Sequence, residues 1–121
     1  RELIRKKPDD FLVISGDDDL VLDVILEGGS GVISVIGQAL VSDFSKMIQL
    51  GLKGDSDSAK TIEKRVMPLI ELIFEENNPA GIKAVLNHMQ LCEDFVRLPL
   101  VVATNTLKSK IASAILEMKS Q

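Results

Sequence analysis

Two short apolar runs, each followed by polar residues, constrain this fold more than any other feature of the sequence. Phe11–Ser15 and Gly31–Val35 are bounded by turn residues, which is the pattern of strands covered on both faces. Between them, residues 17–26 carry apolar side chains at helical spacing, and Gly28 and Gly29 are suited to end that helix. Strand, helix and strand in this order predict a parallel α/β sheet. Because two strands alone leave both sheet edges unpaired, we expect further strands before residue 1.

The rest of the chain is predicted to be helical. Residues 1–7 have the pattern of a short surface helix, and from residue 42 onward the chain is expected to be almost entirely helix. The first of these helices is expected to begin at Ser42 or Asp43 and to run to about Lys53, with Gly54 ending it. The second is expected to be capped by a residue of Asp55–Ser58. The third follows Pro79 and covers about residues 80–89, and the fourth begins near Thr104 or Asn105. Pro68 predicts a kink in the second of them. The expected buried stripes are Ile62, Val66, Leu69, Ile70 and Ile73, and Leu107, Ile111, Ala114, Ile115 and Met118.

Composition limits the classes of function. The 121 residues include 14 basic and 18 acidic side chains, and a net charge of -4 argues against a nucleic-acid-binding protein. One cysteine, Cys92, excludes an internal disulfide and indicates a reducing compartment, which we expect to be the cytoplasm. The longest apolar run, Leu98–Ala103, is far shorter than the ~18 residues of a membrane span. The charged first residues do not have the pattern of a signal peptide, so the chain reads as the continuation of a longer protein.

The glycine and three aspartates after the first run are the strongest candidates for a site. Local structure alone accounts for Asp17, Asp18 and Asp19, because carboxylates at a helix start accept free N–H groups and face the positive end of the dipole. Adjacent aspartates point in different directions, which excludes a metal site made of these three. The second interpretation is positional. Ligands of parallel α/β folds bind at the carboxyl ends of strands, where Gly16, Asp17 and Asp18 lie.

The other candidate residues have simpler structural interpretations. Asp55–Asp57 lacks the glycine and glutamate of a calcium loop, so we expect helix capping there. His88 and Lys83 are expected to lie at or near the surface, and Cys92 to be a small apolar residue in the core or near the surface. The glycines of residues 28–31 precede a strand and therefore form a connection. The chain contains no tyrosine, and these parts do not assemble into a catalytic set.

Several motifs in order resemble one enzyme family. FLVISGDDDLVLDVILEGGSGVISV, GDSDSAKTIEKRVMPLIELIFEENNPAGIKAVL and RLPLVVAT are similar to the C-terminal part of the dihydrodipicolinate synthase family, over about residues 2–116. That family belongs to the N-acetylneuraminate lyase superfamily and folds as a (β/α)8 barrel followed by a helical extension. The resemblance implies that residues 1–54 are the last two βα units of the barrel, with strands seven and eight at residues 11–15 and 31–35. Residues 55–121 would then be the C-terminal helical extension.

The resemblance also implies a chemistry. The family condenses pyruvate with aspartate semialdehyde in lysine biosynthesis, through a Schiff base on a lysine and with a tyrosine that relays protons. Both would precede Arg1, so no catalytic residue is expected in this chain and the 121 residues alone should be inactive. Ile33 and Gly16 match positions that line the bound pyruvate, and Asp17 and Asp18 match acidic residues at the mouth of the pocket. We expect no cofactor, no metal and no membrane partner, and a homo-oligomer, either a dimer or a tetramer.

The chain departs from the family pattern at two places, and other functions stay open. Residues 36–38 replace the common Thr-Ala-Asn, and Gly81 replaces the second proline of the Asn-Pro-x-Pro-x-Lys motif, whose Asn78 and Lys83 we interpret as structural. One alternative is another pyruvate-dependent aldolase or lyase of the superfamily, although Asp17–Asp19 favours the synthase over N-acetylneuraminate lyase. The other is a non-catalytic helical module that self-associates. Apolar strand residues argue against such a module but predict association of the isolated chain.

Overall fold

The computed structural model describes residues 1–120, apart from the side chain of Lys119. The described helices and strands are α1 (Glu2–Lys6), β1 (Ile14–Ser15), α2 (Val21–Leu26), β2 (Gly31–Val32), the 3-10 helix η1 (Ile36–Gln38), α3 (Val41–Leu52), α4 (Ser56–Glu75), α5 (Ala80–His88) and α6 (Asn105–Ser120). The chain divides into two compact units, Arg1–Lys64 and Arg65 onward, with the division inside α4. Each unit is described separately below.

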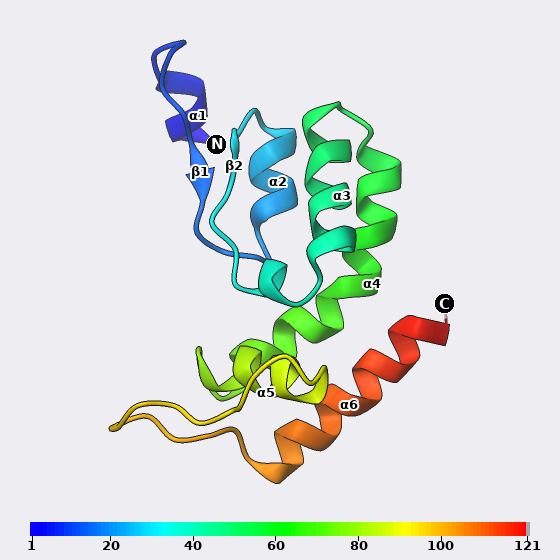
Figure 1. The fold of residues 1–121 in the computed structure, drawn as a ribbon. Helices are drawn as coiled ribbons and strands as arrows, with labels where there is room; N and C mark the ends of the chain where they lie inside the picture. Colours follow the sequence, from blue (N-terminus) through cyan, green and yellow to red (C-terminus); the bar gives the residue numbers. More distant parts are fainter. Residues whose placement is uncertain (121) are drawn as a thin grey trace. The chain divides into compact units, whose positions relative to one another are not determined.

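The first unit contains a two-stranded parallel sheet beside helices. Ile14 pairs with Gly31 and Ser15 with Val32, so the parallel pairing predicted from the sequence is confirmed. Figure 1 shows α2 between the strands and α3, and α2 contacts all three of these elements. The buried apolar side chains of this unit come from α2, α3, the first part of α4, and η1 with the residue after it: Val21, Leu22, Ile25, Ile36, Ala39, Phe44, Met47, Ala59 and Ile62.

The strands are shorter and more exposed than the sequence predicted. Regular pairing covers two residues in each strand instead of Phe11–Ser15 and Gly31–Val35, with one further hydrogen bond on each side, from Ser30 N to Val13 O (2.7 Å) and from Ile33 N to Ser15 O (3.0 Å). The expectation of strands covered on both faces is wrong for this chain, because Leu12 and Ile33 are 67% and 77% exposed. The reason is that each strand has one neighbour among the described residues, so its outer edge and part of its faces have no covering element.

Two predicted helix starts also need correction. α2 begins at Val21, four residues later than expected, and no side chain caps it, so Asp17–Asp19 do not have the capping role predicted for them. α3 begins at Val41 with Leu40 at its N-cap, so Ser42 and Asp43 lie inside the helix and neither is the N-cap residue that the sequence predicted. The helix ends follow the prediction better. Gly28 has φ +104° and donates its N–H to Ile25 O (2.9 Å), and Gly54 has φ +80° after α3.

From α4, which spans both units, the chain continues as helices, but residues 89–104 form no helix, so the prediction of an almost entirely helical chain after residue 42 is wrong there. α4 continues through Pro68, where the kink stays a prediction, and Asp55 caps its start by accepting the N–H of Ser58 at 3.2 Å. Pro79 precedes α5 at the expected place. Both predicted stripes are largely buried: Ile62, Val66, Leu69, Ile70 and Ile73 in α4, and Leu107, Ile111 and Ile115 in α6, with Ala114 and Met118 half-buried. The apolar periodicity therefore identified the buried faces correctly.

The start of α6 is fixed by Thr104 and Glu76. Thr104 Oγ1 accepts the N–H of Leu107 (3.2 Å), while Thr104 donates its N–H and O–H to the Glu76 carboxylate at 2.8 and 2.5 Å. The hydrogen bonds from the Thr104 side chain and backbone lower the pKa of Glu76 below its ordinary value of 4.5. This carboxylate joins the end of α4 to the cap of α6.

This contact makes the stability of the protein depend on pH. Because the folded protein holds Glu76 ionised, the stabilisation is complete above its ordinary pKa of 4.5 and is lost as the pH falls through the lower folded value. We expect Glu76→Gln to lower the urea midpoint of unfolding at about pH 7 and to have little effect at about pH 2. The control is Glu75→Gln, since Glu75 forms an exposed ion pair with Lys110 (2.6 Å) of a kind that contributes little. A loss of stability in Glu76→Gln that is the same at both pH values would contradict this role.

Candidate functional site

The candidate site lies at the carboxyl ends of β1 and β2. Because the strands are parallel, the residues that follow them lie at the same edge of the sheet, with Gly16–Asp18 after β1 and Ile33–Val35 after β2. Backbone and side-chain hydrogen bonds hold both segments. Ile33 N donates to Ser15 O (3.0 Å), and Ser15 Oγ accepts the N–H of Asp17 (3.2 Å) in a tight turn. The structure thus brings together all four residues that the sequence singled out.

Asp18 connects the two segments directly. Its Oδ2 accepts the backbone N–H of Val35 at 3.0 Å and that of Ile36 at 2.7 Å, and only 3% of the residue is exposed. These donors are at the start of η1, so the carboxylate occupies a helix N-terminus, although not that of the helix predicted from the sequence. Ser34 Oγ accepts the N–H of Gly37 (2.8 Å) and fixes the same turn.

The other three residues of the site, Gly16, Asp17 and Ile33, are accessible to solvent. Gly16 is exposed, and a Cβ built on it would have no heavy atom within 4 Å. Asp17 is exposed, and Ile33 is 77% exposed although it directly follows a strand. An apolar side chain, an uncovered stretch of backbone and a carboxylate therefore face outward at one sheet edge. An exposed edge that combines apolar and polar groups in this way is the kind of surface that can line a binding site.

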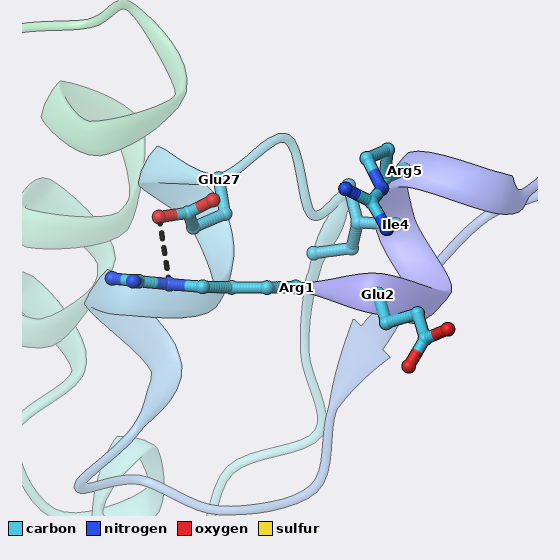
Figure 2. Close-up of a pocket in the computed structure, with 5 residues that line it drawn as sticks. All are labelled: Arg1, Glu2, Ile4, Arg5 and Glu27. Carbon is cyan, nitrogen blue, oxygen red and sulfur yellow. Dashed lines mark ion pairs between the residues drawn. The ribbon is translucent and has the colours of Figure 1, made fainter.

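A surface hollow near α1 lies at the opposite edge of the sheet. Figure 2 shows its lining of Arg1, Glu2, Ile4, Arg5 and Glu27, with Arg1 Nε paired to Glu27 Oε1 at 3.0 Å. Glu27 follows α2, and the chain runs from there to the amino end of β2. The hollow therefore belongs to the amino ends of the strands, and the candidate site belongs to their carboxyl ends. Arg1 and Glu27 neutralise each other's charge in an exposed ion pair, which contributes little. Residues at the amino ends of the strands in such folds generally serve stability.

The carboxyl groups whose pKa is shifted lie away from the carboxyl ends of the strands, and each shift has a local cause. Partial burial raises the pKa of Glu63, with a further rise from the negative charge of Asp23 that Lys60 opposes. The hydrogen bond from Lys108 lowers the pKa of Asp94. In the part of the chain that the structure describes, no three His, Cys, Asp or Glu residues are arranged to hold a metal ion. None of its helices is long and apolar enough to cross a membrane.

The other residues that the sequence analysis considered lie outside the candidate site. His88 is exposed at the end of α5, as expected, and Cys92 is an exposed free thiol. The half-buried Lys83 has its Nζ 5.2 Å from the ring centroid of Phe95, a cation–π contact that supports its structural interpretation. Sequence reasoning missed the two serines of the site, Ser15 and Ser34. The spacing of Ser34 to Gly37 is a recognisable capping pattern and was the available signal.

Comparison with known proteins decides what this strand-end arrangement belongs to. The sequence model of the Dihydrodipicolinate synthetase family matches residues 1–118. The chain belongs to this family. It is 47% identical over 110 residues to the 4-hydroxy-tetrahydrodipicolinate synthase of Flavobacterium psychrophilum, covering 91% of this chain and 38% of that protein. It is 46% identical over 119 residues to the synthase of Azobacteroides pseudotrichonymphae, covering 98% of this chain and 40% of that one.

Solved dihydrodipicolinate synthases have the same fold over this part of their chains. The Aquifex aeolicus structure superposes with a TM-score of 0.92 at 29% identity, covering 98% of this chain and 40% of that one. The Thermotoga maritima structure gives 0.88 at 30% identity, with 93% and 38% covered. The chain thus spans about 40% of the length of its relatives. Its strands, α2 and α3 are the last βα units of the family's (β/α)8 barrel, and helices of the C-terminal extension follow.

Proposed function

We propose that this chain is the C-terminal part of a dihydrodipicolinate synthase, a Schiff-base lyase that condenses pyruvate with aspartate semialdehyde in lysine biosynthesis. The observation that supports it is the exposed edge formed by Gly16, Asp17 and Ile33 at the carboxyl ends of two parallel strands, in a chain of this family. Binding sites of (β/α)8 barrels are built at that end. The division into a barrel end, residues 1–54, and a helical extension, residues 55–121, is part of the proposal.

In this proposal each residue of the edge has a role set by its surroundings. The exposed Ile33 lines the apolar side of bound pyruvate, and Gly16 lets the backbone approach because nothing fills the space at its Cα. Asp17 lies at the pocket mouth, where the second substrate arrives. We assign Asp18 to the mouth region as well, although its carboxylate is turned toward the backbone of Val35 and Ile36. No cofactor or metal is required by these roles.

The lysine and tyrosine of the chemistry would come from the part of the barrel that this chain does not contain. The chain has no tyrosine, and no lysine follows β1 or β2 at the sheet edge. We therefore propose that residues 1–121 alone are inactive. The complete enzyme would act as a homo-oligomer, and the free thiol of Cys92 fits a reducing compartment such as the cytoplasm.

A hybrid enzyme tests this function. The matching 38% of the Flavobacterium psychrophilum synthase is replaced by this chain, and the hybrid is incubated with pyruvate and borohydride before its intact mass is measured. We expect the mass of a reduced pyruvate adduct, together with condensation activity, while this chain alone stays at 13.2 kDa. In the hybrid, Ile33→Asp is expected to raise the KM for pyruvate about tenfold or more, because a charge replaces apolar contact.

The Ile33→Val variant of the hybrid is the matched control for Ile33→Asp. Ile33→Val keeps an apolar side chain of similar shape and should leave the KM for pyruvate within about threefold of the unsubstituted hybrid. A folded hybrid that forms no pyruvate adduct would contradict the proposed function. An Ile33→Asp hybrid with an unchanged KM for pyruvate would contradict the role of Ile33 and leave the family chemistry in place.

A further inference from the structure

The Asp18 carboxylate binds the backbone of the site. A charged residue at the mouth of a pocket would instead be expected to face the substrate. The Asp18 carboxylate is buried, with 3% of the residue exposed, and both hydrogen bonds of Oδ2 go to backbone N–H groups of the opposite segment. Hydrogen bonds to an ionised carboxylate are about twice as strong as those between neutral groups. Asp18 therefore fixes the backbone of Val35 and Ile36 relative to the end of β1.

This contact determines where Ile33 lies. On one side Ile33 is held by the hydrogen bond from its N–H to Ser15 O at 3.0 Å, the last of the sheet. Two residues later, Val35 N is held by Asp18 at 3.0 Å. Ile33 thus lies between two anchors, one from Ser15, the last residue of β1, and one from Asp18, which follows β1. Loss of the Asp18 anchor would release the backbone of Val35, between Ile33 and the buried Ile36, and let the Ile33 side chain shift.

The second carboxylate oxygen of Asp18 differs from the first, because none of the described residues donates to it. Among the described residues, Asp18 Oδ1 is buried and has no hydrogen-bond partner. A buried oxygen without a partner carries a desolvation penalty, and most buried polar atoms in proteins avoid it by forming a hydrogen bond. Unfavourable features of this kind concentrate at functional sites, where geometry is maintained at the expense of stability.

We propose that Asp18 is a positioning residue for pyruvate, which acts by holding Ile33 in place and does not contact either substrate. This inference rests on the proposed function for the role of Ile33. The hydrogen bonds between Asp18 and the backbone of Val35 and Ile36 can be tested independently of any activity. The two levels can therefore be tested separately.

The first test measures amide hydrogen exchange in the 121-residue chain. We expect Asp18→Ala to speed exchange of the Val35 and Ile36 amides about tenfold or more, because both lose their acceptor. Asp18→Asn keeps a carbonyl oxygen and should have a smaller effect. Asp19→Ala is the matched control, since Asp19 is the exposed neighbour and should leave both amides unchanged. Unchanged exchange of both amides in Asp18→Ala overturns the anchor. If the alanine variant does not fold, Asp18→Ser takes its place, because the shorter side chain cannot reach both amides, and unchanged exchange there overturns the anchor equally.

The second test uses the hybrid enzyme and separates the two substrates. We expect Asp18→Ala to raise the KM for pyruvate about tenfold, with a smaller change in the KM for aspartate semialdehyde, and Asp18→Asn to restore most of the pyruvate affinity. If Asp18 instead met the second substrate by its charge, Asp18→Asn would raise the KM for aspartate semialdehyde and leave exchange intact, which overturns the proposal. A variant that is less stable but has both KM values unchanged also overturns it. An inactive unsubstituted hybrid would count against the proposed function alone.

Discussion

Replacing Leu22 by alanine is expected to lower the free energy of unfolding by about 2–5 kcal/mol, the range for removing a buried leucine side chain. Leu22 is 1% exposed in α2, the helix that contacts both strands and α3. Its Cδ1 would lie 3.0 Å from a Cβ placed on Gly51, so it fills the close contact between α2 and α3. Truncation leaves a cavity at that contact, which chemical denaturation of the variant would measure.

Leu20 provides the matched control for this measurement. It has the same side chain two residues earlier, but it is 52% exposed at the start of α2. Leu20→Ala should therefore change the free energy of unfolding by no more than about 0.5 kcal/mol. Equal effects of the two substitutions would show that α2 does not present the face described here to α3.

Gly81→Ala is expected to destabilise the protein by more than about 3 kcal/mol, at or beyond the upper end of the usual cost of overpacking. Gly81 is buried in the first turn of α5, where an added Cβ would lie 2.6 Å from both the carbonyl carbon and the Cα of Ile73 and closer still to its carbonyl oxygen. These are backbone atoms of α4, which cannot move without displacing the helix. In an unconstrained helix the same substitution would be stabilising by up to about 1 kcal/mol, so the sign of the effect is informative.

Gly51→Ala separates this effect from the general cost of filling a buried glycine. Gly51 is also buried and helical, but its nearest neighbours would be side-chain atoms of Leu22 and Ile25 at 3.0 and 3.1 Å. Side chains can adjust, so we expect a loss of no more than about 1–2 kcal/mol in urea titration. If Gly81→Ala were as mild as Gly51→Ala, the close approach of α5 to Ile73 would be wrong.

The sequence by itself determined the elements whose signals are local. Helical periodicity identified the buried stripes of α4 and α6, and the glycines after α2 and α3 marked where those helices end. Both signals depend on residues within a few positions of each other, so no tertiary information is needed to interpret them. The motif order also identified the family, which the match over residues 1–118 confirmed. The pocket roles of Gly16, Asp17, Asp18 and Ile33 were predicted from the same resemblance and stay predictions.

Only the tertiary structure decided how long the strands are and what Asp18 contacts. Strand pairing depends on neighbours, and with one neighbour each the two apolar runs pair regularly over two residues. The sequence placed Asp18 beside α2, where local capping is the natural interpretation. Its actual partners, the N–H groups of Val35 and Ile36, are 17 and 18 residues away along the chain. Parallel pairing of β1 and β2 brings those residues together, because it places both strand ends at one edge of the sheet.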